Sequence, residues 1–154
     1  MYRSLCALII GLIVSAQCLA QQSLVGTYRL VSNDLRLDGQ PITSMGKSQH
    51  GYLVITPKVM ISFFTADERK TGASVEAKAA LLDTLTAWAG PWRAEGNRIF
   101  IDIDTAWTEV WRGKQQVRTY EVDGKRLTLI VAPQPSATQP GKTLTARSVW
   151  EKID

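Results

Sequence analysis

The sequence predicts an all-β fold, an antiparallel barrel of about eight to nine short strands with one amphipathic helix. Alternating β-branched and aromatic runs recur along the chain, and Gly, Pro, Asn and Asp separate them. Only one segment has helical periodicity. The first run places a lone glycine, Gly26, two residues before Tyr28. Many small barrels begin this way, because backbone can approach at the glycine while the aromatic ring plugs the barrel floor. A β-sandwich is the competing architecture.

Residues 1–20 have the layout of a secretory signal peptide. One positive charge precedes the apolar stretch Leu5–Ala16, and Cys18-Leu19-Ala20 offers small residues at the cleavage positions. An uncleaved anchor helix and lipidation at Cys18 are the alternatives, but the stretch is short for a bilayer and Gln17 departs from a lipobox. We therefore expect residues 21–154 to form one exported domain, periplasmic or secreted.

The composition limits the classes of partner. Cleavage removes both cysteines, so roughly 130 residues must fold on their core alone. The formal net charge falls from +4 to +3 when the one arginine of the leader is lost. The remaining positive charge is spread along the chain, which makes nucleic acid a poor partner. We expect no integral membrane segment in the mature chain, and the oligomeric state stays open.

Three strands are predicted to open the domain. Leu24–Asn33 is the first, and Leu37–Pro41 supplies turn residues after it. His50–Thr56 and Val59–Thr65 form a hairpin around Pro57-Lys58. The second strand of this hairpin is largely apolar on both faces, so we expect it to be covered on both sides.

The helix is predicted over Ser74–Ala89. Ser74 suits an N-cap, and Glu76 places a negative charge in the first turn. Gly90-Pro91 ends the helix. The apolar stripe that makes it amphipathic comprises Leu81, Leu82, Leu85 and Trp88. We expect this helix to pack across the sheet or to close one end of the barrel.

The second half of the chain returns to strands. Asp123-Gly124 is a tight hairpin signal, and the segment Ala132–Lys142, which has three prolines, is predicted as a surface loop that forms a rim or flap. The predicted strands are Trp92–Glu95, Arg98–Asp104, Thr108–Arg112, Gln116–Val122, Arg126–Val131 and Thr143–Lys152.

In this order the elements resemble the bacterial lipocalin-like domain family. The opening Leu24–Leu30 is similar to that family's Leu-x-Gly-Thr-Trp-x-Leu, with Tyr28 in place of the tryptophan. Further matching segments are Gly51–Pro57, Met60–Ser62, Ala89-Gly90, Gln116–Arg118, Asp123–Leu129 and Val149–Glu151. The resemblance implies a lipocalin-like β-barrel with a central cavity, and no single chemistry, since related barrels serve as carriers and as cyclases or isomerases.

The resemblance also suggests a structural role for an arginine at the barrel floor. In classical lipocalins an arginine from a late strand packs over the aromatic residue of the opening strand. Arg118 or Arg147 would cover Tyr28 in this way, and Arg118 is preferred because it lies in a matching segment. Gly26, Tyr28 and Arg118 would then form the floor.

Several kinds of catalytic site lack their residues. His50 is the only histidine and the mature chain has no cysteine, so a zinc site would lack its usual ligands. A Gly-x-Ser-x-Gly nucleophile elbow and a cysteine nucleophile are also missing. We expect neither a metal nor a cofactor.

The predicted ligand-binding residues are mostly aromatic. Trp107, Glu109 and Trp111 align if their segment is extended, which would give aromatic walls beside one acid. They could equally pack between barrel and helix, with Glu109 paired to Arg112 or Arg118. Tyr52 and Phe63 of the hairpin complete the predicted lining.

Three side chains are candidates for proton transfer. His50 shares a face with Tyr52, and Asp102 shares one with Asp104, where one carboxyl could act as a general acid. Glu109 is the third candidate. A solvent-exposed His50 and outward-facing aspartates explain the same patterns without catalysis.

Two functions of different kind therefore compete. The first is an exported barrel that binds a small apolar or amphiphilic molecule in a central cavity. The alternative is a cofactor-free cyclase, isomerase or lyase in which Glu109, Asp102 or His50 moves a proton. An interaction domain that uses the helix face or the proline-rich rim is a third possibility.

Overall fold

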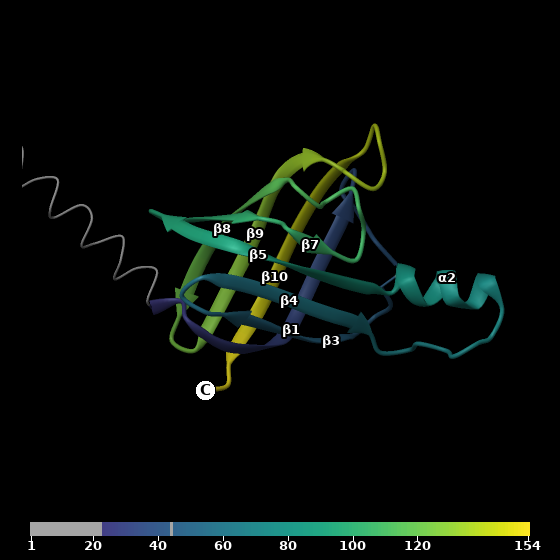
Figure 1. Cartoon of the computed structure of the whole chain (residues 1–154), viewed down its shortest axis with the longest axis horizontal. Coiled ribbons are helices and arrows are strands. Elements are labelled where there is room, and N and C mark those ends of the chain that lie inside the picture. Colours follow the sequence, from purple (N-terminus) through teal and green to yellow (C-terminus); the bar gives the residue numbers. More distant parts are fainter. Residues whose placement is uncertain (1–22, 44) are drawn as a thin grey trace, which may run out of the picture.

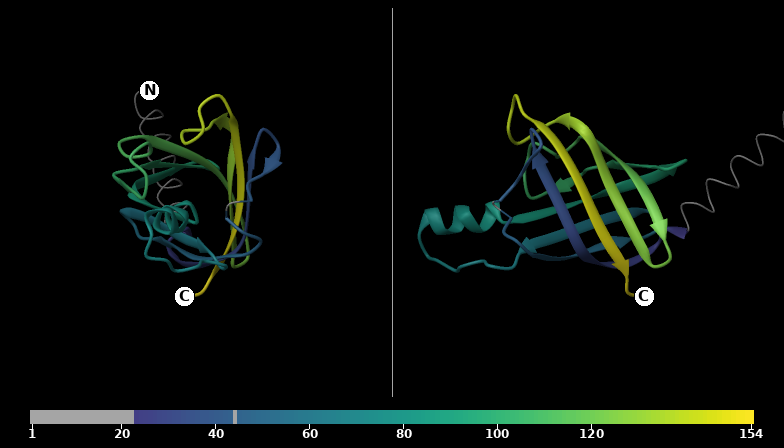
Figure 2. Two further views of the ribbon diagram at one scale, coloured as in Figure 1. Left: turned by 90° about the vertical axis from the view of Figure 1, so that its right-hand side faces the viewer. Right: turned by 180° about the vertical axis from the view of Figure 1, so that it is seen from behind.

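A computed structural model describes residues 23–43 and 45–154 (Figure 1). Eight strands wind into a closed antiparallel barrel, two short strands lie beside it, and the described residues hold one helix (Figure 2). The barrel strands are β1 Gly26–Leu37, β3 Gln49–Ile55, β4 Val59–Ala66, β5 Leu85–Glu95, β6 Arg98–Asp102, β8 Gln115–Asp123, β9 Arg126–Pro135 and β10 Thr143–Lys152. The short strands are β2 Gln40–Pro41 and β7 Thr105–Ala106, and the helix is α2 Val75–Asp83.

The first and last strands close the barrel. In β1, Tyr28 lies opposite Leu53 of β3 on one side and Lys152 of β10 on the other. The register between β1 and β10 shifts between Leu30 and Ser32, a bulge of the kind that bends a strand around a barrel. The predicted all-β barrel is confirmed. The competing sandwich is excluded because β1 pairs with β3 on one side and with β10 on the other, so the sheet closes on itself.

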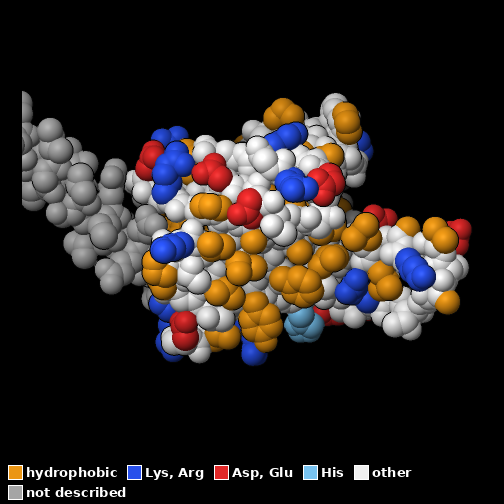
Figure 3. Space-filling model, viewed as in Figure 1, with side chains coloured by type: hydrophobic (Ala, Val, Ile, Leu, Met, Phe, Trp, Pro, Cys, Tyr) orange, Lys and Arg blue, Asp and Glu red, His pale blue; other side chains and the backbone are white. Residues whose placement is uncertain are grey.

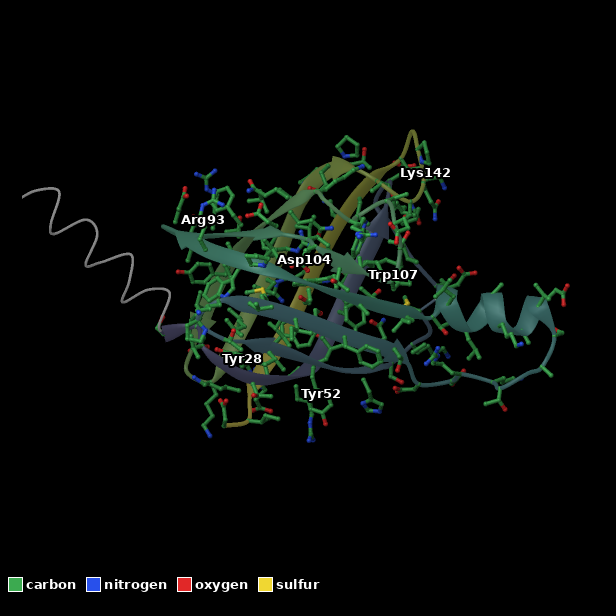
Figure 4. The ribbon with its side chains drawn as sticks, viewed as in Figure 1. Tyr28, Tyr52, Arg93, Asp104, Trp107 and Lys142 are labelled. Carbon is green, nitrogen blue, oxygen red and sulfur yellow. The ribbon has the colours of Figure 1, made fainter. Side chains whose placement is uncertain are left out.

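Alternate residues of each strand form the core. In β5 the buried positions are Thr86, Trp88, Gly90, Trp92 and Ala94, which is the period of two of a strand with one face inside. The floor is the end of the barrel at which Leu24 and Tyr28 are buried. There the Tyr28 hydroxyl donates to the Leu24 carbonyl at 2.9 Å. Figure 4 shows Tyr28 near this end and Trp107 toward the other.

The two glycines singled out by the sequence meet different neighbours. A Cβ at Gly26 would meet only side-chain atoms of Lys152 and Asp154, the nearest being Lys152 Cε at 2.5 Å, so the predicted close approach of backbone at the first strand is not found. At Gly90 a Cβ would lie only 2.0 Å from the Asp102 carbonyl oxygen, a backbone atom that cannot move aside alone. Gly90 is therefore needed where β5 crosses the end of β6.

The helix is shorter than the sequence predicts. Ser74 caps α2 by accepting from the Ala77 N–H at 3.1 Å, as expected, but the helix ends at Asp83. The predicted extension to Ala89 is wrong, because Leu85–Glu95 pairs with β4 as strand β5. None of the residues of α2 is buried, and the helix projects from one end of the barrel (Figure 1).

Further boundaries differ from the prediction. Strand β1 continues to Leu37, into the predicted turn, and β6 ends at Asp102 and not at Asp104. Thr108–Arg112 is a turn and not a strand, since the Trp111 N–H donates to the Thr108 carbonyl at 3.2 Å. The predicted loop from Ala132 begins later, because β9 continues to Pro135 and pairs with β10. The connection between β9 and β10 is therefore Ser136–Lys142.

The predicted signal peptide, residues 1–20, lies outside the described residues. Among those described, no helix is long and apolar enough to cross a bilayer.

Candidate functional site

The barrel encloses a cavity of about 410 Å³. The cavity lies above the floor, toward the end of the barrel at which residues 136–142 connect β9 to β10. Phe64 and Trp150 form one wall, with ring centroids 6.2 Å apart in an edge-to-face arrangement. The apolar lining comprises Leu35, Phe64, Trp88, Trp111, Leu129, Val131, Pro135, Ala137, Leu144, Ala146 and Trp150.

Polar side chains make up the rest of the lining, ten of the 21 residues. Among them, Ser148 Oγ accepts from the Trp150 indole N–H at 2.8 Å, so that hydroxyl fixes a wall of the cavity. Ser62 Oγ is buried and has no hydrogen-bond partner among the described residues. A ligand hydroxyl or carbonyl could satisfy it, because a buried polar atom without a partner is costly.

Arg118 of β8 is the only charged side chain that is buried in the described part of the chain. It is 9% exposed and lines the cavity. Its Nη1 donates to the Val117 carbonyl at 3.1 Å and its Nη2 to Gln116 Oε1. Burial lowers the pKa of the Arg118 guanidinium to about 10, so the group is still cationic at neutral pH.

The side chains that line the cavity carry a net positive charge. Arg118 and Lys114 both contribute to it, and no Asp or Glu is among the lining residues. No carboxylate lies within 4.0 Å of the Arg118 guanidinium in the described residues. The cavity is thus apolar with one buried, unpaired cation.

Of the predicted aromatic pair, only Trp111 reaches the cavity. Trp107 packs behind it, with ring centroids 4.5 Å apart at 84°. Glu109 is exposed, and its Oε2 lies 3.5 Å from Arg112 Nη1. This pairing with Arg112 is the predicted alternative to a place in the pocket lining. The predicted alignment of the three residues required an extended segment, and the turn at 108–112 separates them.

Tyr52 and Phe63 lie on the outside of the barrel. They face each other across β3 and β4, 47% and 50% exposed, and Tyr52 points away from the barrel in Figure 4. The inward residues of β3 are instead Gly51, Leu53 and Ile55. Ile61 of β4 is exposed as well. Figure 3 shows apolar side chains gathered on the lower part of the barrel surface in this view.

The proton-transfer candidates also lie outside the cavity. His50 is exposed, with Nε2 3.2 Å from Asp67 Oδ1. Asp102 is exposed and accepts from Gln115 Nε2 at 2.7 Å, and Asp104 is exposed as well. Since Glu109 faces solvent too, none of the acid or base residues named for the enzymatic alternative lines the cavity.

The floor is built differently from what the resemblance implied. The cation over the Tyr28 ring is Lys152, whose Nζ lies 5.9 Å from the ring centroid and donates to the Val25 carbonyl at 2.7 Å. Arg118 lies in the cavity instead. Burial, and secondarily the charge of Asp154, raises the pKa of the Tyr28 hydroxyl.

The sequence contained a signal for the polar cavity residues. Gln116 and Arg118, two positions apart on β8, both line the cavity, and each is at least partly buried. Alternation alone does not say which of the two faces is inside, so these residues could not be selected without the barrel. Within residues 23–43 and 45–154, no three His, Cys, Asp or Glu side chains gather as metal ligands do.

Comparison with known proteins identifies one family. A family model described as a lipocalin-like domain matches residues 25–153, nearly the whole chain. No curated protein matches the sequence significantly.

Proposed function

Because the chain belongs to the lipocalin-like domain family, we propose that it is an exported barrel that binds a small apolar or amphiphilic molecule in its central cavity. The observation that carries the proposal is the cavity itself. Its volume of about 410 Å³ lies in the range of small-molecule sites, about 300 to 1,000 Å³. Its walls combine aromatic and aliphatic side chains with ten polar or charged residues among the 21 that line it, a mixture that suits an amphiphilic molecule.

Burial of apolar ligand surface would supply most of the affinity. Transfer of apolar area out of water contributes about 25 cal/mol per Å², and the partly buried indole of Trp111 and the aliphatic side chains of the lining offer that area. The polar groups would set the orientation of the ligand. The enzymatic alternative has no observation in its favour, because its candidate residues lie outside the cavity.

Native mass spectrometry of the protein purified from its own host tests the proposal. We expect a noncovalently retained molecule that is released on denaturation. The same spectrum tests export, since cleavage after Ala20 makes Gln21 the first residue of the mature chain. A full-length mass would contradict cleavage without affecting the binding proposal.

A titration with neutral 1-decanol, followed by tryptophan fluorescence, tests the cavity directly. We expect saturable binding that Ala146→Phe abolishes, because Ala146 lines the cavity and the larger side chain fills it. Ala132→Phe on the exposed part of β9 is the matched control and should bind normally. An empty protein from the host together with no 1-decanol binding would overturn the proposal.

A further inference from the structure

We infer that the ligand is an amphiphilic carboxylate whose head group binds Arg118, an inference that rests on the proposed function. It concerns the chemical class of the molecule that enters the cavity. Its basis is the juxtaposition of one buried guanidinium with aromatic walls and no carboxylate of the protein.

In the ligand-free protein the charge of the Arg118 guanidinium is not neutralised by a described carboxylate. A buried cation is costly unless it is paired, and among the described residues Arg118 donates to the Val117 carbonyl and the Gln116 amide, with no carboxylate beside it. Two neutral acceptors leave the positive charge uncompensated, and they also leave other guanidinium N–H groups able to donate. A carboxylate would supply both the opposite charge and two acceptor oxygens in the geometry that a guanidinium prefers.

The Arg118 guanidinium is held in place at the cavity wall. Arg118 is among the residues that line the cavity, and Gln116, two positions earlier on the same strand face, holds one end of its guanidinium. The guanidinium is therefore fixed by a neutral neighbour and not by an acid that would compete with a ligand. Gln116 is in this sense a positioning residue.

Arg118 does not have the structural role at the barrel floor that the family resemblance implied. Lys152 covers Tyr28 at the floor, so Arg118 is not needed there. Lys114 is the second cationic side chain of the lining. It is exposed, and it adds to the positive charge of the cavity. Anionic head groups are thus favoured over neutral ones, and cationic head groups are disfavoured.

The test compares three ligands that share one tail: decanoate, 1-decanol and decylammonium. Tryptophan fluorescence follows binding at neutral pH, since Trp88, Trp111 and Trp150 line the cavity. We expect the wild type to bind decanoate about tenfold or more tightly than 1-decanol, and decylammonium most weakly. Lowering the pH through the carboxyl pKa, about 4 to 5, should remove the preference for decanoate and leave 1-decanol binding unchanged.

Two variants assign the preference to one side chain. Arg118→Gln should make decanoate and 1-decanol bind equally, and Arg118→Lys should restore part of the difference because it keeps the charge. Arg147→Gln is the matched control, since Arg147 is exposed on β10 and should leave the preference intact.

The outcomes separate this inference from the proposed function. Equal binding of decanoate and 1-decanol by the wild type, or an undiminished preference in folded Arg118→Gln, would overturn the inference and leave the ligand-binding barrel standing. Binding of none of the three ligands would overturn the proposed function itself. The wild-type comparison needs no variant, so it decides the matter even if Arg118→Gln does not fold.

Discussion

At the scale of single residues, Arg118 has a cost in the empty protein. Its guanidinium is buried with neutral partners only. Replacement of a buried ion pair by apolar side chains of similar volume is often neutral or stabilising by about 1 to 4 kcal/mol, and a buried cation without a carboxylate partner carries the desolvation cost without the pairing energy. A residue kept at such a cost is expected to serve binding and not folding.

This argument predicts that Arg118→Met stabilises the ligand-free protein by about 1 to 3 kcal/mol. Urea unfolding at neutral pH measures the change, and Arg147→Met on the exposed face should stay within about 0.5 kcal/mol of the wild type. A clear loss of stability in Arg118→Met alone would mean that the side chain is a structural part of the core.

Tyr28 illustrates a buried polar group that serves the fold. Its hydroxyl donates to the Leu24 carbonyl, so Tyr28→Phe leaves that carbonyl without a buried donor. We expect a loss of about 1 to 2 kcal/mol in urea unfolding at about pH 8. Tyr52→Phe is the control, because Tyr52 is about half exposed and should change stability little.

The same tyrosine gives a pH dependence. Burial raises the pKa of the Tyr28 hydroxyl above its ordinary value of 10.0. The neutral form is therefore favoured in the folded state, so this contribution is complete below the unfolded pKa and is lost as the pH rises through the folded one. The stability difference between wild type and Tyr28→Phe should shrink in strongly alkaline buffer. A difference that grows with pH would contradict the assignment.

Residue roles were the least predictable part of the sequence. Trp111 could be predicted as a cavity residue, but Trp107 and Glu109 were grouped with it only because an extended segment was assumed. Period-two alternation in β3 and β4 identifies two faces without saying which is inside, and this explains why Tyr52 and Phe63 were placed in the pocket. The resemblance places Arg118 at the floor, whereas the side chain lines the cavity above it.

At the scale of elements, β5 shows how a strand can imitate a helix. Leu85 and Trp88 fit a helical stripe that continues from Leu81 and Leu82, and Gly90-Pro91 resembles a helix stop. The competing pattern is the alternation of Thr86, Trp88 and Trp92 into the core. Pairing with β4 decides between them, because it satisfies the backbone and buries two indoles at once.

Gly90 is therefore needed for close packing within the barrel and does not end a helix. Gly90→Ala should destabilise the protein by about 3 kcal/mol or more, because the added methyl would meet a backbone oxygen at 2.0 Å. Gly124→Ala is the control: its added methyl meets nothing within 4 Å, and only its positive φ of 56° costs about 1 kcal/mol. Thermal unfolding of the two variants compares them, and equal losses would refute the close approach.

Helix α2 is expected to contribute little to the barrel. It has no buried residue, so breaking it should leave the core intact. Ala79→Pro removes a backbone donor in the helix interior, and we expect a small loss of helical signal in circular dichroism with an almost unchanged barrel melting temperature. Collapse of the barrel in this variant would show that α2 supports the fold.

At the scale of the whole molecule, the architecture was the most predictable property. Turn residues at Leu37–Pro41, Pro57-Lys58 and Asp123-Gly124 divide the chain into strands of similar length, and few ways exist to join so many short antiparallel strands. Closure through β1 and β10 depends on contacts between the two ends of the domain, for which the sequence carried only the opening glycine and aromatic.

The barrel also explains why the site differs from its prediction. The cavity is formed by residues from both halves of the chain, with Phe64, Trp88, Arg118 and Trp150 far apart in sequence. Local patterns reveal pairs two positions apart, such as Asp102 and Asp104, and these lie on the surface. The chemistry of the interior becomes visible only when the strands are placed around it.

The most direct test is a crystal structure of the protein with decanoate. We predict electron density for the tail among Trp88, Trp111 and Trp150, with the carboxylate on the Arg118 guanidinium at hydrogen-bond distance. An empty cavity with decanoate on the outer surface near Tyr52 and Phe63, or a tail bound with its carboxylate away from Arg118, would contradict this account.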